Sequence, residues 1–329
     1  MRTRAIPRAD LEVSEVGLGT WQYGGDWGQV TDEQARSVLH TALDAGVTFL
    51  DTADVYGDGR SERLVGAVVA ERGDAERVTV ATKVGRRADP HVASAYTPAA
   101  LRGWVTRSLE NLAVERIDLL QLHCPPPEVY ADDEVFGALD ALAEEGRIAA
   151  YGVSVETCDE ALSAIARPGV ASIQIILNAF RRKPLEEVLP AASEAGIGII
   201  ARVPLASGLL TGRYDLDTSF PADDHRNFNR QGDAFDVGET FAGVPFEVGV
   251  RAAQEMSELA GPDHTPAQLA LRWILDHDAV STVIPGASSV QQVEGNVAAS
   301  ALPPLDAETH ERLREIYDRH IREHVHHRW

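Results

Sequence analysis

Eight short apolar segments alternate along the 329-residue chain with segments whose apolar residues recur at helical spacing. Alternation of this kind predicts a parallel sheet, and eight such units predict that the sheet closes into a (β/α)8 TIM barrel. The expected strands are Glu15–Gly19, Val47–Asp51, Arg77–Val84, Ile117–Leu122, Ala149–Ser154, Ser172–Leu177, Gly198–Val203 and Ser281–Ile284. The expected helices include Thr31–Ala45, Thr97–Leu112, Asp132–Glu145, Pro184–Ala195, Phe246–Ala260, Thr265–Asp278 and Ala307–Arg322.

Helix boundaries and one irregular stretch complete this prediction. Thr31 and Thr97 are suitable N-caps, and glycines follow several expected helices, at Gly46, Gly146 and Gly196. The stretch Thr211–Pro245 has no sustained period, and its place after the seventh strand puts it at the carboxyl rim, where barrel enzymes keep their sites. Since no linker interrupts the chain, we expect residues 1–329 to form a single barrel domain with a short N-terminal cap, a long loop after strand 7 and extra C-terminal helices.

Composition and charge limit the classes of partner. With 44% hydrophobic and 25% charged residues the chain is globular, and its formal charge of −21 disfavours nucleic-acid binding. The beginning lacks the apolar stretch of a signal peptide, and no later run approaches the ~18 residues that span a bilayer. Cys124 and Cys158 are too few for a disulfide scaffold. We therefore expect a cytoplasmic protein that acts on a small molecule, without a nucleic-acid or membrane partner; the oligomeric state is left open.

Polar residues at the ends of consecutive expected strands indicate a catalytic site. Asp51 and Tyr56 follow the second strand, Lys83 lies in the third, and His123 follows the fourth. Singly, each has an ordinary structural explanation: a cap, a rim aromatic, a solvated charge and a core histidine. Jointly they favour one site, because the carboxyl ends of barrel strands converge on one mouth.

These groups suit the reduction of a carbonyl. Tyrosine, with an ordinary pKa of about 10, holds its proton too tightly to be an efficient acid at neutral pH. An ammonium about 4 Å away would favour the phenolate by roughly 4 kcal/mol at an effective dielectric of 20, partly offset by desolvation. We therefore expect Lys83 to lower the pKa of Tyr56, Asp51 to hold Lys83 charged, and neutral His123 to donate a hydrogen bond to the carbonyl oxygen.

Seven ordered motifs make the whole chain resemble the aldo-keto reductase superfamily: GLGTWQYGG, FLDTADVYGDGRSERLVG, ATKVG, LLQLHCP, GVSVE, PLASGLLTG and IPGASSVQQVEGN. The resemblance implies NAD(P)H-dependent reduction of aldehydes or ketones, with Asp51, Tyr56, Lys83 and His123 as the catalytic tetrad and Tyr56 as proton donor. Family members accept sugars, aromatic aldehydes, quinones and steroids, so the substrate is not predicted.

The resemblance also implies an extended cofactor across the barrel mouth, with NADP(H) favoured over NAD(H). The chain lacks a Rossmann fingerprint, since Gly17-Leu18-Gly19 is not followed by the required glycine. A glycine turn that opens into a helix, as in IPGASSVQQVEGN, offers free backbone N–H groups for phosphate. The cofactor contacts implied are Trp21, Ser154, Gln174, Arg202, Pro204, Leu205, Ser207, Gly208, Leu209, Gly286, Ser288, Gln292 and Asn296.

Three departures from the family pattern concern the cofactor. Ser288 stands where many relatives carry a basic residue, so the 2'-phosphate would depend on Arg213 and Arg226 in the long loop. Val155 stands where relatives often have asparagine. Arg202 stands where many relatives stack a tyrosine on the nicotinamide; it would either lie against that ring or pair with an acidic neighbour.

Alternatives remain open at this point. The GASS variant of the last motif also occurs among relatives that bind NADP(H) as redox-sensing or regulatory partners with slow turnover. A barrel hydrolase using Asp51 and Glu62 would leave Lys83 and Tyr56 without a role. Trp21 and Tyr23 could wall the substrate pocket or pack for stability. His320 and His324 are one helical turn apart, a metal-binding spacing without supporting ligands, so no metal is predicted.

Overall fold

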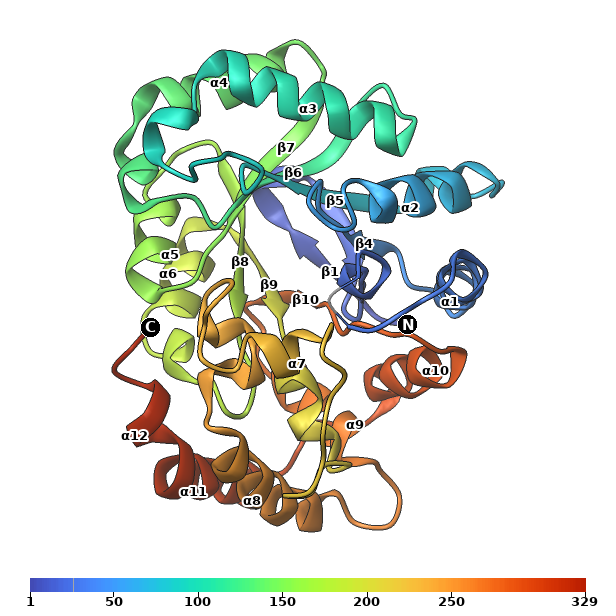
Figure 1. Ribbon diagram of the computed structural model, residues 1–329, viewed down its shortest axis with the longest axis vertical. Helices are drawn as coiled ribbons and strands as arrows, with labels where there is room; N and C mark the ends of the chain where they lie inside the picture. Colours follow the sequence, from blue (N-terminus) through green and yellow to red (C-terminus); the bar gives the residue numbers. More distant parts are fainter. Residues whose placement is uncertain (26) are drawn as a thin grey trace.

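The computed structural model describes residues 1–25 and 27–329, and a parallel barrel stands at its centre (Figure 1). Its strands are β3 (Leu18–Gly19), β4 (Phe49–Asp51), β5 (Thr79–Val84), β6 (Ile117–His123), β7 (Ile148–Ser154), β8 (Val170–Ile176), β9 (Gly198–Arg202) and β10 (Val280–Val283). They follow one another in this order in an 8-stranded sheet. Parallel bridges between Val16 and Val283 and between Gly19 and Gly286 join its two edges. The predicted (β/α)8 barrel and its eight strands are therefore confirmed.

Helices surround this sheet (Figure 1). Those that follow the strands are α1 (Asp32–Asp44), α2 (Arg60–Ala70), α3 (Pro98–Leu112), α4 (Asp133–Glu144), α5 (Cys158–Ile165), α6 (Val188–Ala195), α9 (Pro266–Leu275) and α10 (Val290–Ala298). The additional helices are α7 (His225–Phe228), α8 (Phe246–Ser257), α11 (Ala307–Ile316) and α12 (Arg322–Val325). Thr31 and Thr97 cap α1 and α3 through their side chains, as expected.

Two expected helices depart from regular α-helix within their predicted length. The segment Pro184–Ala195 begins as a 3-10 turn at Lys183–Leu185, and α6 starts only at Val188. An unbroken helix from Pro184 would place Pro190 in its interior, where the missing N–H costs a hydrogen bond; near the start of α6 that N–H is not needed. The last helix passes through a π-helical turn at Tyr317–Ile321 before α12.

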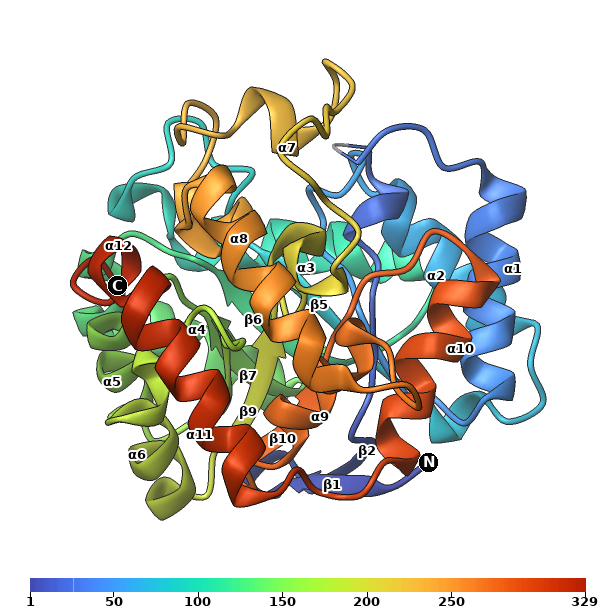
Figure 2. The same cartoon turned by 90° about the horizontal axis from the view of Figure 1, so that it is seen from below.

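The short N-terminal cap is a hairpin of β1 (Thr3–Ile6) and β2 (Leu11–Ser14). Its Ile6 and Val13 are fully buried and pack with Phe49, Leu119 and Ile200 inside the barrel. Figure 2 shows this hairpin at one end of the barrel and the segment with α7 at the other. The amino-terminal end of the barrel is therefore filled with apolar side chains, and the opposite end is left for the site.

The irregular stretch after the seventh barrel strand folds into short turns rather than long helices. It contains α7 and 3-10 turns at Val237–Glu239 and Phe241–Gly243. Within the described residues, no helix is long and apolar enough to cross a membrane.

Candidate active site

The four residues expected to form a catalytic tetrad lie together at the carboxyl rim. Asp51 ends β4, His123 ends β6, and Lys83 lies between them in β5, where it pairs in register with Gln121. Asp51, Tyr56 and His123 line a cavity of about 600 Å³, and Lys83 is buried behind them. Parallel pairing of β4, β5 and β6 explains this convergence, because it directs the carboxyl ends of these strands to one rim of the barrel.

Lys83 connects the carboxylate to the phenol. Its Nζ donates a hydrogen bond to Asp51 Oδ1 at 2.5 Å and another to the Thr52 carbonyl at 2.9 Å, and it lies 3.5 Å from Tyr56 Oη. Burial opposes the ammonium, but Asp51 and Tyr56 outweigh it, so the pKa of Lys83 lies above its ordinary value. Lys83 is therefore a fixed cation beside the tyrosine oxygen.

Two glutamines hold the second oxygen of Asp51. Gln174 Nε2 donates to Asp51 Oδ2 at 2.8 Å, and Gln121 Nε2 donates to the same oxygen at 3.2 Å. Gln174 also lines the cavity, as Ser154 does. Gln174 was expected to contact the cofactor carboxamide, yet its amide nitrogen is bound to the carboxylate, so its position is fixed in advance by the tetrad.

The net effect of Lys83 on Tyr56 differs from the expectation. Burial raises the pKa of Tyr56, and the nearby Lys83 lowers it only in part, so the pKa lies above its ordinary value. The predicted net lowering is therefore wrong for the protein alone. The Coulomb argument had the right sign, but the loss of hydration around a buried phenol is larger.

His123 lies beside the phenol as a neutral side chain. The rings of His123 and Tyr56 meet edge to face with their centroids 6.0 Å apart. Burial, followed by the charges of Arg86 and Lys83, places the pKa of His123 well below its ordinary value. Its Nδ1 is buried and has no hydrogen-bond partner among residues 1–25 and 27–329. Since His123 lines the cavity, its neutral ring can donate a hydrogen bond to a ligand without carrying a charge.

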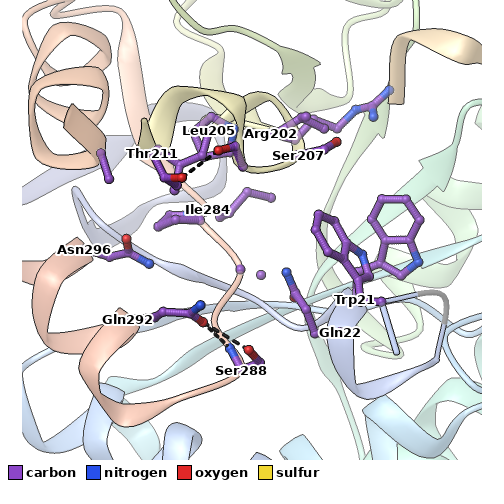
Figure 3. Close-up of a pocket in the computed structure, with 18 of the residues that line it drawn as sticks. Trp21, Gln22, Arg202, Leu205, Ser207, Thr211, Ile284, Ser288, Gln292 and Asn296 are labelled. Carbon is purple, nitrogen blue, oxygen red and sulfur yellow. Dashed lines mark hydrogen bonds between the residues drawn. The ribbon is translucent and has the colours of Figure 1, made fainter. Parts of the chain in front are cut away.

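Besides the tetrad, the cavity is lined by the floor formed after β9 and by the start of α10. Figure 3 shows Leu205 and Ser207 of this floor facing Ser288 and Gln292 across the cavity. The expected cofactor residues that line it are Trp21, Ser154, Gln174, Arg202, Pro204, Leu205, Ser207, Gly208, Arg213, Arg226, Gly286, Ser288, Gln292 and Asn296. Leu209 does not line it: the side chain is 1% exposed and packs in the core against Gly249 of α8. In the segment Ala206–Thr211, Ser207 and Gly208 have positive φ, and this local turn directs Leu209 inward.

The arginines at the far end of the cavity differ in their partners. Arg226 donates to Asp224 Oδ1 at 2.8 Å and to the Tyr214 hydroxyl at 2.7 Å, and its cation lies 4.8 Å from the Trp27 ring centroid. Arg213 is exposed at the cavity margin. Ser288 gives its backbone N–H and hydroxyl to Gln292 Oε1. Of the two arginines, Arg213 is therefore the more available to an anionic ligand.

Arg202 pairs with an acidic neighbour, which is one of the two arrangements expected for it. Its Nη1 lies 3.5 Å from Glu239 Oε1, and its Nη2 donates to the Val155 carbonyl at 3.0 Å. The same carboxylate oxygen accepts a hydrogen bond from Arg86 at 2.8 Å. Burial raises the pKa of Glu239, but Arg86 and Arg202 outweigh it, so the pKa lies below its ordinary value. Arg202 thus lines the cavity as half of an ion pair.

An aromatic wall borders the tetrad. The Trp21 ring stacks on His225 at 4.8 Å between centroids, contacts Trp27 edge-on at 5.5 Å, and lies 6.2 Å from Tyr56. Tyr23, the other candidate for this wall, is instead fully buried in the core. Because Tyr23 follows Trp21 by two residues in a 3-10 turn, the two side chains leave the turn on different sides.

Sequence reasoning did not single out several of the residues at this site. Trp27, His225 and Glu239 come from irregular segments that carry no periodic signal. Arg86 had a weak signal, since it follows the ATKVG motif directly. Cys124, Glu156 and Glu239 offer ligand atoms within 4.8 Å of one another, but Arg86 donates to both carboxylates, so a guanidinium already compensates that cluster.

Comparison with known proteins agrees with this geometry. The profile described as "Aldo/keto reductase family" matches residues 15–318. The chain belongs to the aldo/keto reductase family. Relatives in this family include the uncharacterized oxidoreductase YqkF of Bacillus subtilis, 33% identical over 91% of this chain and 91% of the relative, and the Bacillus subtilis aldo-keto reductase YhdN, 32% identical over 89% of this chain and 87% of the relative.

Solved structures of the family superpose along the whole chain. The glycerol dehydrogenase AKR11B4 from Gluconobacter oxydans matches with a TM-score of 0.79 and 33% identity, covering 97% of this chain and 96% of that one. The aldo-keto reductase AKR11C1 from Bacillus halodurans, in its holo form, has a TM-score of 0.76, 28% identity and 96% coverage of both chains. An aldo-keto reductase from Klebsiella pneumoniae in complex with NADPH has a TM-score of 0.70 and 25% identity, covering 96% of this chain and 95% of that one.

Proposed function

We propose that this aldo/keto reductase reduces small aldehydes or ketones to alcohols with NADPH, and that Tyr56 is its proton donor. The observation that carries the proposal is the buried Lys83–Asp51 ion pair, whose ammonium lies 3.5 Å from Tyr56 Oη at the wall of a cavity. A hydrolase would have no use for a cation held against a phenol. A tyrosine that must release its proton to an alkoxide needs such a cation, because the cation stabilises the phenolate left behind.

The cavity fits a dinucleotide in shape and charge. Its lining includes three tetrad residues, Arg213 and residues of the first turn of α10. The first turn of a helix presents unpaired N–H groups, which suit a phosphate. The Klebsiella pneumoniae relative was solved with NADPH. Ser288, Gln292, Asn296 and Arg213 would hold the adenosine-phosphate end, and Ser154 and Arg202 would border the nicotinamide.

Each residue of the tetrad then has its own role in the reduction. When bound, NADPH supplies the hydride. His123, which is neutral and lines the cavity, donates a hydrogen bond to the substrate oxygen and orients it. Tyr56 gives its proton to that oxygen as it becomes an alcohol. Lys83, fixed by Asp51, stabilises the phenolate, and the raised pKa of Tyr56 before substrate arrives keeps the phenol protonated at neutral pH.

Tyr56→Phe tests the proposal, since it removes the donor and keeps the ring. With a panel of carbonyl substrates, NADPH and NADH at matched concentrations, turnover should fall by at least about 10²-fold, the low end of acid–base contributions. The dissociation constant of NADPH should change less than about twofold.

Tyr130→Phe is the matched control, because the Tyr130 hydroxyl is buried, has no hydrogen-bond partner within the described residues and does not line the cavity. It should retain full activity. A Tyr56→Phe enzyme with half of the wild-type turnover would remove Tyr56 as the acid. A wild-type enzyme that gives one fast turnover and then almost none would favour a redox-sensing partner over a steady reductase.

A further inference from the structure

A short segment between α7 and α8, residues 236–243, forms part of the cavity wall; we call it the strap. Its Glu239 lines the cavity. The Glu239 carboxylate accepts a hydrogen bond from Arg86 at 2.8 Å and lies 3.5 Å from Arg202. The strap therefore supplies the counter-ion for a cavity arginine, although its sequence shows no regular pattern.

The strap has an unfavourable backbone. Phe241, Ala242 and Gly243 follow one another at φ values of 54°, 58° and 79°. The left-handed conformation is unfavourable for residues that have a Cβ. Two such residues in succession keep this conformation only where surrounding contacts impose it. The conformation of the strap must therefore be held from outside.

On the barrel side the strap is held by Ser207. The Ser207 hydroxyl donates to the Glu239 carbonyl at 3.2 Å and accepts from the Phe241 N–H at 3.1 Å. This serine belongs to the cavity floor after β9, so the strap and the floor are joined through one side chain.

On the outer side the strap is held by Trp329. The indole N–H donates to Asp236 Oδ1 at 3.1 Å, and the ring is 5% exposed. A Cβ placed on Gly243 would lie 2.3 Å from the indole, and one on Gly238 would lie 3.1 Å from it. The indole thus packs directly on the backbone of two strap glycines, one on each side of Glu239.

Arg181 connects this contact to the barrel. Its guanidinium lies 3.7 Å from the Trp329 ring centroid, and it donates to the Ala242 carbonyl at 3.4 Å and to the Glu156 carbonyl at 3.1 Å. Arg181 is 2% exposed, so the stack is sequestered from water. Trp329, Arg181 and the strap form one packed unit beside the end of β7.

We propose that Trp329 is a positioning residue of the substrate pocket: it fixes the strap in its left-handed conformation and thereby holds Glu239 on Arg202 and Arg86 at the cavity wall. The inference rests on the proposed function only in taking this cavity as the place where a carbonyl substrate binds. Trp329 does not line the cavity and acts through Asp236, Gly238 and Gly243.

The first measurement follows the strap itself, in the protein without substrate. Hydrogen exchange of the amides of residues 239–243 should be at least about tenfold faster in Trp329→Ala than in wild type, because the strap then opens locally. Trp329→Phe keeps an aromatic ring but loses the indole N–H that bonds Asp236, and should lie between wild type and Trp329→Ala. Ile321→Ala is the control: Ile321 is fully buried in the π-helical turn that packs on α8, and its loss destabilises the same terminal region.

The second measurement follows the pocket. For the best carbonyl substrate, Trp329→Ala should raise KM by about tenfold, the scale of one displaced charge-assisted hydrogen bond, with kcat within about twofold. Glu239→Gln should raise KM similarly. Because Trp329 acts through Glu239, adding Trp329→Ala to Glu239→Gln should raise KM by less than about twofold more.

The outcomes separate the two proposals. The positioning role would be overturned if hydrogen exchange in the strap were equally fast in Trp329→Ala and Ile321→Ala. An unchanged KM in Trp329→Ala, or fully additive effects on KM in the double variant, would overturn it as well. A wild-type protein that reduces no carbonyl would instead overturn the proposed function, and the exchange measurement would still decide whether Trp329 holds the strap.

Discussion

Asp54, close to the tetrad in sequence, allows the electrostatics of the site to be tested, because its ionisation should make the free energy of unfolding depend on pH. The side chain is fully buried three residues after Asp51, and neither carboxylate oxygen has a hydrogen-bond partner within the described part of the chain. Burial raises the pKa of Asp54 to about 7 from an ordinary 3.8, and Glu62 adds to the rise while Arg87 and Arg107 oppose it. A carboxyl group in this position prefers to be neutral.

The sign of the pH dependence follows from proton binding. Between pH 3.8 and about 7 the folded protein retains a proton on Asp54 that the unfolded chain has lost, so the free energy of unfolding falls as pH rises through this window. A shift of about three units means that ionisation of Asp54 destabilises the fold by about 4 kcal/mol above pH 7, and by about 1.5 to 2 kcal/mol at pH 5.

Asp54→Asn removes the charge and keeps the shape. We expect the stability of the variant relative to wild type to increase by about 2 to 3 kcal/mol between pH 5 and pH 8. The assay is urea denaturation followed by circular dichroism at both pH values. The general effect of the net charge cancels, since wild type and variant are compared at each pH.

Asp58→Asn is the matched control, four residues away. Its carboxylate is exposed and bound to Arg87 and Arg107, and the Arg87 hydrogen bond followed by these charges holds the pKa of Asp58 below its ordinary value. Its removal should give no gain at pH 8. A stability difference between Asp54→Asn and wild type that is the same at pH 5 and pH 8 would refute the reasoning.

The remaining predictions concern the cofactor. Arg213→Ala should weaken NADPH binding by at least about tenfold and NADH binding by less than twofold in fluorescence titrations, because a 2'-phosphate needs an available cation; equal weakening would contradict this. Arg226→Ala should weaken both cofactors alike, since Arg226 already pairs with Asp224 and supports the rim. If Arg202 borders the nicotinamide, the dissociation constant of NADP⁺ divided by that of NADPH should exceed unity in wild type and fall in Arg202→Tyr. The fall should be only a few fold, because Glu239 lies 3.5 Å from Arg202 and offsets its charge. An unchanged ratio would leave Arg202 a structural residue.

The parts of the site that the sequence predicted are those that the barrel itself places. Asp51, Lys83 and His123 lie on or at the ends of neighbouring parallel strands, and strand register alone brings them to one rim. The sign of the pKa shift of Tyr56 was not predictable, because it depends on how completely the folded chain removes water from the phenol. The sequence did not decide whether Tyr23 packs in the core, and it did not predict that the Leu209 side chain points away from the cavity, because both depend on the local geometry of 3-10 turns.

The strap could not be predicted for a different reason. Its conformation is set by contacts between residues far apart in the sequence: Glu239 with Arg86, and Asp236 with Trp329. A segment without an apolar period carries no local signal of such contacts. The left-handed Phe241 and Ala242 even oppose local preference, so the tertiary structure overrides the propensity of the chain at this point.

Charge pairing around the cavity decides where an anionic cofactor can gain affinity. Lys83 is bound to Asp51, Arg202 lies beside Glu239, and Arg226 is bound to Asp224, so these three cations already have carboxylate partners. A phosphate that approached any of them would meet a carboxylate at close range and would have to displace it, which removes most of the gain. Arg213 is exposed at the margin, and the first turn of α10 has backbone N–H groups at the cavity. Both features can bind negative charge without loss of an ion pair that exists among the described residues. It follows that cofactor affinity should depend steeply on Arg213 and on the start of α10, whereas the paired cations control the shape and the proton chemistry of the cavity.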